Sequence, residues 1–161
     1  RRWLIALISD TGMRLAEAAG LHIDDLHLEE EIPYANIKPH PWRSLKTKGS
    51  QRQVPLVGAS LWAAQRIKQT ASSYFAFDRY TDNQQCRANS ASNALNKWMQ
   101  THFRDDIVIH GFRHALRDRL RAVQCPSEMI DQIGGWSSGK IGEGYGEGFG
   151  LKAILGMLLH V

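Results

Sequence analysis

Residues 110–145 constrain this chain more than any other stretch, because they combine two helical patterns with a glycine-rich run. The first pattern repeats apolar side chains at helical spacing, which predicts a buried stripe. Its members are Phe112, Leu116, Leu120 and Val123. Another face of the same helix carries His110, Arg113, His114, Arg117 and Arg121. That face is either simply solvated, as charged helix faces often are, or it binds an anion such as a phosphate.

The segment after this helix favours the anion-binding interpretation. Pro126 is expected to begin a short helix that ends at the glycine pair 134–135. Trp136 follows, and Tyr145 stands in a run rich in glycine and serine. Tyr145 has glycine on both sides, whereas a core tyrosine usually has apolar neighbours at regular spacing. The candidate chemical groups are therefore His110, Arg113 and Tyr145, with Trp136 as a wall beside them.

Length and composition are those of one modest globular domain. The chain has 161 residues, 43% of them hydrophobic, which is enough for a single core. Its formal charge of +4 is mildly basic and compatible with nucleic acid. Cys86 and Cys125 fit neither a disulfide framework nor a metal-ligand spacing, which indicates a reducing compartment. No apolar run reaches membrane-spanning length and no signal peptide is recognisable. The chain opens inside a helical pattern without Met, so we expect a fragment of a longer protein.

The remaining patterns predict an α+β, mainly α fold with a small three-stranded antiparallel sheet. Helices are expected over residues 3–8, 11–20, 58–73, 89–103 and 151–159. The sheet is expected between residues 32 and 56, after a turn and an early strand near Leu26 and Leu28. Its strands are residues 32–37, 42–47 and 53–56, and a hairpin turn at Lys48-Gly49-Ser50 joins the last two. Neither a domain boundary nor an internal repeat is evident.

Two further sets of charges stand out from these elements. Arg14 is expected in the first turn of a helix that Thr11 caps, where a cation is unfavourable for the helix dipole. This placement hints at a role other than stability, although an ordinary surface arginine is the alternative. Lys46, Lys48 and Arg52 are expected at the tip of the hairpin, and such exposed basic tips are common.

Taken together, four segments resemble the catalytic domain of the tyrosine recombinases of the phage integrase family. T-G-M-R-L-A-E-A-A-G-L resembles the first arginine box of the family, with Arg14 as its arginine. L-K-T-K-G-S-Q-R-Q-V-P-L resembles its lysine hairpin, and H-G-F-R-H resembles the second box, H-x-x-R, with His110 and Arg113. G-G-W-S-S followed by Tyr145 resembles the last box, in which a His or Trp precedes the nucleophilic tyrosine. Each box alone is weak, but all four occur in order, at fitting distances, over nearly the whole chain.

The resemblance implies phosphoryl transfer from DNA to a tyrosine. Tyr145 would attack the scissile phosphate, release the 5′-hydroxyl and leave a 3′-phosphotyrosine link. Arg14 and Arg113 would stabilise the negative charge of the transition state, because a guanidinium binds two oxygens at once. His110 would assist proton movement to or from the tyrosine.

Three further roles follow from the same resemblance. Lys48 would protonate the leaving oxygen, with Lys46 as the alternative because the register of the hairpin is open. Trp136 would donate its indole N–H to the phosphate or buttress the pocket. Glu17 would orient its neighbours. No metal or cofactor is expected, because the acidic residues form adjacent runs near predicted loops and do not suggest a two-metal site.

The resemblance also implies the biological setting. Residues 1–161 would form a single catalytic domain of a phage or mobile-element integrase, without the amino-terminal DNA-clamping domain of the family. The partner would be double-stranded DNA, bound by a homotetramer that assembles through the carboxy-terminal helix, in the bacterial cytoplasm at the nucleoid and away from membranes. Two alternatives are a type IB topoisomerase-like enzyme and a non-catalytic DNA-binding relic of an integrase.

Overall fold

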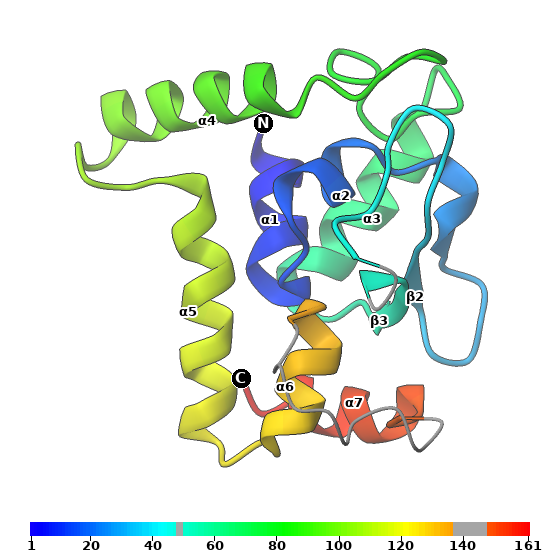
Figure 1. Ribbon diagram of the computed structural model, residues 1–161, viewed down its shortest axis with the longest axis vertical. Helices are drawn as coiled ribbons and strands as arrows, with labels where there is room; N and C mark the ends of the chain where they lie inside the picture. Colours follow the sequence, from blue (N-terminus) through cyan, green and yellow to red (C-terminus); the bar gives the residue numbers. More distant parts are fainter. Residues whose placement is uncertain (48–49, 137–147) are drawn as a thin grey trace.

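The computed structural model describes residues 1–47, 50–136 and 148–161, and these residues form a mainly helical domain (Figure 1). The helices are α1 (Arg2–Thr11), α2 (Leu15–Ala19), α3 (Gly58–Thr70), α4 (Ala88–His102), α5 (Ile109–Ala122), α6 (Ser127–Gly134) and α7 (Leu151–Leu158), with a short 3-10 turn, η1 (Ile23–Asp25), before the sheet. Lys48 and Tyr145 both lie outside the described residues.

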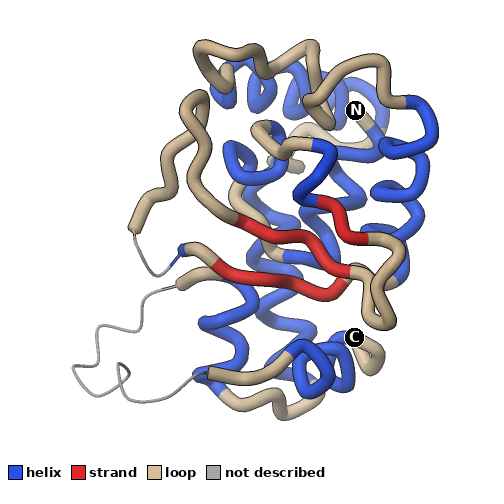
Figure 2. Tube along the Cα trace, turned by 90° about the vertical axis from the view of Figure 1, so that its right-hand side faces the viewer, coloured by secondary structure: helices blue, strands red, loops and turns tan. Residues whose placement is uncertain are grey.

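The strands are β1 (Leu26–His27), β2 (Tyr34–Ile37) and β3 (Arg52–Pro55), and they form one antiparallel sheet in that order (Figure 2). Ala35 lies opposite Leu26 on one side and opposite Val54 on the other. These three side chains are buried together, because residues directly opposite each other on paired strands point to the same face of the sheet. The predicted fold class, mainly α with a small three-stranded antiparallel sheet, is confirmed.

The predicted strand at residues 42–47 is wrong. Pro39 and Pro41 lack backbone N–H donors, and this segment forms a loop between β2 and β3. Arg43 turns inward and is 4% exposed, and its guanidinium donates to the carbonyl of Glu17 at 2.6 Å. The segment is thus tied to α2 by a buried side chain, and β3 takes the place beside β2.

The predicted capping of the second helix by Thr11 is also wrong. Thr11 is the last residue of α1, and its hydroxyl donates to the carbonyl of Leu7. Gly12 follows in the left-handed conformation, with φ of 62°, and ends α1. Arg14 therefore stands directly before α2, not inside its first turn.

Helix α1 lies at the centre of the domain, between α3 and α5 (Figure 1). Its residues Leu4, Leu7 and Ile8 are almost completely buried. On α3 the buried residues are Ser60, Ala63, Ala64 and Ile67, whereas Trp62 is 43% exposed. Arg113, in the first half of α5, donates to the carbonyl of Gly12, so α5 meets the turn that leads from α1 to α2.

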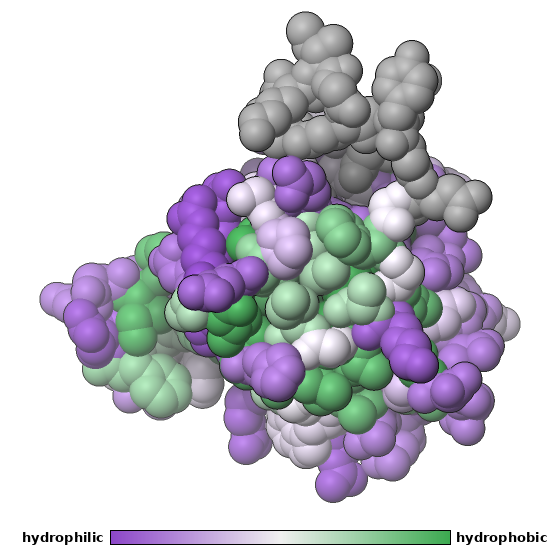
Figure 3. All heavy atoms as spheres, turned by 90° about the horizontal axis from the view of Figure 1, so that it is seen from below, coloured by the Kyte–Doolittle hydropathy of each residue, from purple (hydrophilic) through white to green (hydrophobic). Residues whose placement is uncertain are grey.

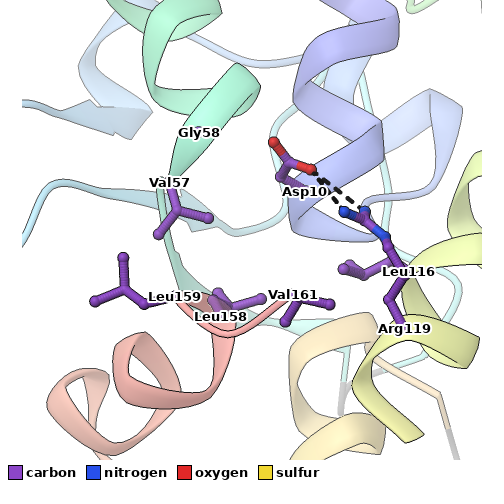
Figure 4. A pocket seen from close by; sticks show the side chains of 8 residues that line it. All are labelled: Asp10, Val57, Gly58, Leu116, Arg119, Leu158, Leu159 and Val161. Carbon is purple, nitrogen blue, oxygen red and sulfur yellow. Dashed lines mark hydrogen bonds and ion pairs between the residues drawn. The ribbon is translucent and has the colours of Figure 1, made fainter. Parts of the chain in front are cut away.

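Helix α7 packs on its own domain. Ile154 and Leu158 are buried, whereas Leu159 is 67% exposed. Leu158, Leu159 and Val161 line a cavity of about 220 Å³ beneath α1, α3 and α5, beside an ion pair between Asp10 and Arg119 (Figure 4). Viewed from below, apolar surface gathers in the middle of this end of the molecule with polar residues around it (Figure 3).

Within the described ranges, no helix combines the length and the apolar character that crossing a bilayer requires.

Candidate active site

Arg14 links α2 to the end of α6. Its backbone N–H donates to Glu17 Oε2 at 2.8 Å, and its Nη1 donates to Glu17 Oε1 at 2.8 Å. Its Nη2 donates to the carbonyl of Gly135 at 2.7 Å. About a quarter of the side chain, 24%, remains exposed, so the guanidinium is held by protein partners and still meets solvent.

Glu17 shares its carboxylate between two arginines. Oε2 also accepts a bond of 2.9 Å from Nη2 of Arg52, and both side chains are almost fully buried. Burial by itself would raise the pKa of Glu17. The charge of Arg52 and the hydrogen bonds from Arg52 and Arg14 outweigh burial and hold that pKa below its usual value. Glu17 is therefore ionised at neutral pH and balances part of the positive charge around it.

Arg52 is the residue that the sequence pattern misplaced. Instead of lying at an exposed hairpin tip, it begins β3 and is 7% exposed. Nε donates to the carbonyl of Ile133 and Nη1 to the carbonyl of Ser50, both at 2.7 Å. The alternation of β3 carried the missed signal, because Arg52 and Val54 are two residues apart and share a face. Three chain segments meet at this guanidinium.

The turn between β2 and β3 closes beside Arg14. The backbone N–H of Ser50 donates to the carbonyl of Thr47 at 3.1 Å, and the two hydroxyls are 2.9 Å apart. Arg14 Nη1 also donates to the hydroxyl of Ser50, at 3.3 Å. Lys46 is exposed.

Arg113 lies on α5 with its head group turned toward α1 and α6. It is 3% exposed, and its Nη1 donates to the carbonyl of Gly12. Its Cζ lies 4.2 Å from the centroid of the Trp136 ring, a cation–π contact. Burial, and then the charge of Arg14, lower the pKa of Arg113 to about 9. The group is still protonated at pH 7, so two guanidinium groups lie near each other with their charges only partly balanced.

Trp136 is fixed by the end of α6. Its backbone N–H donates to the carbonyl of Asp131 at 2.9 Å, after Gly135 in the left-handed conformation with φ of 61°. A Cβ on Gly134 would lie 1.9 Å from the indole ring, and one on Gly135 would lie 2.6 Å from Arg52 Nη1. Both glycines are therefore required by close approach, which gives the G-G-W sequence a physical meaning.

His110 stands next to this group, in a cleft of about 230 Å³ that Arg113 also lines. Its ring meets that of His114 edge to face, with centroids 4.6 Å apart. Partial burial lowers the pKa of His110, and the charges of His114, Arg113 and Arg14 lower it further. The imidazole is therefore neutral at pH 7 and able to accept a proton.

The structure thus brings Arg14, Arg113 and Trp136 together and places His110 in the adjoining cleft. Tyr145 and Lys48, the other two predicted site residues, lie outside the described residues. Over the part of the chain that the structure covers, no group of three His, Cys, Asp or Glu side chains is arranged to hold a metal ion.

Comparisons with known proteins agree with this architecture. The model of the phage integrase family matches residues 1–147. No curated protein matches the sequence. Similar solved structures include the Tn1549 transposon integrase in complex with a circular intermediate DNA, at 16% identity and a TM-score of 0.58. They also include the same integrase with transposon right end DNA, at 18% identity and a TM-score of 0.56.

Each of these two alignments covers 95% of this chain and 52% of the other, so the chain spans about half the length of the integrases it matches. At such low identity the likeness shows a shared fold. The family model covers most of the sequence, and the chain therefore belongs to the phage integrase family.

Proposed function

We propose that this protein is a tyrosine recombinase that cleaves and rejoins double-stranded DNA through transient attachment to Tyr145, as part of a phage or mobile element. The observation that carries the proposal is the meeting of Arg14 and Arg113. They come from distant parts of the chain and are held by the carbonyls of Gly135 and Gly12, and Arg113 also stacks on the ring of Trp136.

The charge balance of this group favours a phosphate ligand. Arg14 and Arg52 pair with one carboxylate, that of Glu17, whose charge also acts on the nearby Arg113. Burial is the main cause of the lowered pKa of Arg113, and repulsion from the charge of Arg14 lowers it further. A phosphodiester would relieve this repulsion and would gain most in the transition state, where negative charge gathers on its non-bridging oxygens.

The proposed reaction begins when the Tyr145 oxygen attacks the scissile phosphorus and its proton passes to His110. The bond from phosphorus to O5′ breaks as Lys48 donates a proton to that oxygen. A 3′-phosphotyrosine link remains, and Trp136 supports the phosphate. Because this link keeps the energy of the broken bond, a 5′-hydroxyl of a second strand can reverse the reaction without ATP.

Recombination requires two duplexes and so several subunits. We propose that four copies assemble on DNA and that α7, which packs on its own domain here, passes to a neighbouring copy. Truncation after Gly150 should then weaken assembly on DNA, measured by sedimentation, and reduce strand exchange. Unchanged assembly and exchange in the longer protein would contradict this exchange of helices.

A nicked suicide substrate tests the proposed function directly. With such DNA the released fragment diffuses away, so the covalent protein–DNA adduct should accumulate and be visible on a denaturing gel. Adduct formation should persist in EDTA, because every proposed catalytic group is a side chain. Loss in EDTA that magnesium restores would point to a metal mechanism, and relaxation of supercoils without strand exchange would point to a topoisomerase-like enzyme.

A further inference from the structure

Arg52 combines deep burial with contacts to three chain segments, at Glu17, Ser50 and Ile133. Its carbonyl partners, those of Ser50 and Ile133, are what an architectural arginine would bind. Its third partner is different, because Glu17 is also the partner of Arg14. The contact with Glu17 therefore connects Arg52 to a residue of the proposed reaction.

The carboxylate of Glu17 divides its side-chain bonds between the two arginines. Oε1 accepts from Arg14 Nη1 at 2.8 Å, and Oε2 accepts from Arg52 Nη2 at 2.9 Å. A guanidinium next to a free carboxylate prefers two parallel hydrogen bonds, one to each oxygen. While Arg52 occupies Oε2, Arg14 can form one such bond and keeps its Nη2 on Gly135.

The net charge of the group formed by Arg14, Arg52 and Glu17 also depends on Arg52. Two arginines around one carboxylate leave one positive charge in excess, whereas Arg14 alone with Glu17 would be neutral. Each nitrogen of the Arg52 guanidinium already donates to a protein oxygen, on Ile133, Ser50 or Glu17. The side chain of Arg14, in contrast, is 24% exposed. The buried arginine thus balances the carboxylate, and the partly exposed one keeps its charge for a ligand.

We propose that Arg52 is a positioning residue for DNA cleavage, which holds one oxygen of Glu17 so that the Arg14 guanidinium stays oriented and uncompensated for the scissile phosphate. This inference rests on the proposed function of Arg14. If it holds, removing Arg52 lowers the rate of DNA cleavage because the negative charge of Glu17 then neutralises Arg14.

The test is a cycle of three variants, Arg52→Met, Glu17→Gln and the double variant, each assayed for the rate of adduct formation on the suicide substrate. In Arg52→Met the carboxylate is free to pair with Arg14, and the rate should fall by about 100-fold. In the double variant the carboxylate is gone, so its rate should equal that of Glu17→Gln to within about twofold. Arg66→Met, which removes an exposed arginine of α3, should leave the rate unchanged.

Two results would overturn the inference. One is Arg52→Met cleaving as fast as the unaltered protein, and the other is the double variant cleaving far more slowly than Glu17→Gln. The second result would mean that Arg52 acts through Ser50 and Ile133 as ordinary architecture. If Arg52→Met does not fold, the comparison of the double variant with Glu17→Gln still decides, because the buried pair has been removed as a unit. Absence of adduct in the unaltered protein would instead refute the proposed function.

Discussion

At the scale of single residues, the site consists of arginine side chains that donate hydrogen bonds to backbone carbonyls. Arg14 and Arg113 each bind a glycine carbonyl next to a chain reversal, and neither Gly12 nor Gly135 has a side chain in the way. Helix ends have carbonyl groups without intrahelical partners, so arginines are suitable donors for them. The same bonds that end the helices therefore orient the groups proposed to hold the phosphate.

The pH dependence of cleavage tests the role of His110. A base works in its neutral form, and the pKa of His110 is lowered by burial and by the charges of His114, Arg113 and Arg14. The rate at low DNA concentration should therefore fall only at a pH below that at which an ordinary histidine titrates. His114→Gln removes one of these charges, so it should raise the pKa and move the acid limb to higher pH.

His160→Gln provides the matched control, because it makes the same exchange at an exposed position after α7. Its acid limb should coincide with that of the unaltered protein. An acid limb that stays in place in His114→Gln, or moves equally in both variants, would contradict the assignment of His110 as the proton acceptor.

Sequence reasoning singled out Arg14, His110, Arg113 and Trp136 because motif spacing is visible in a linear chain, and their catalytic roles stay predictions. It missed Arg52, because a basic residue near a predicted turn is usually exposed and the buried carboxylate partner comes from a distant segment. It also misjudged Thr11, whose hydroxyl can cap a following helix or bond back into the preceding one. The burial of Arg52 and the hydrogen-bond partner of Thr11 both depend on tertiary contacts, which the linear sequence does not display.

At the scale of elements, the helices followed from apolar periodicity, and the sheet was only partly predictable. Residues 42–47 have strand-like composition, but the buried Arg43 binds the carbonyl end of α2 and holds the segment as a loop. Strand pairing is a long-range choice that local composition does not decide. This error does not alter the predicted site, because none of the site residues that the structure describes lies in residues 42–47.

Helix α7 gives an element-scale prediction on stability. Leu158 is 2% exposed, so Leu158→Ala should lower the free energy of unfolding by about 2–5 kcal/mol. Leu159→Ala is the control, because that side chain is 67% exposed and its loss should change stability by about 0.5 kcal/mol at most. Urea unfolding of both variants measures the difference, and equal effects would show that α7 does not pack in cis in solution.

At the scale of the whole molecule, α2, α5, α6 and β3 each bring one part of the site to a common place around α1. Arg14 and Arg113 are far apart in the chain, so their relative position depends on the packing of the entire core. In the proposed reaction, the hydroxyl of Tyr145 attacks the phosphate that these arginines hold.

Replacement of that hydroxyl is the most direct measurement. Tyr145→Phe should form no covalent adduct with the suicide substrate, because the nucleophile is absent. Its affinity for DNA should be nearly unchanged, because one ring oxygen contributes little beside the contacts with the phosphate backbone. Gel analysis of the adduct and a titration with labelled duplex would measure both. Adduct formation by the Phe variant at the rate of the unaltered protein would contradict the central claim.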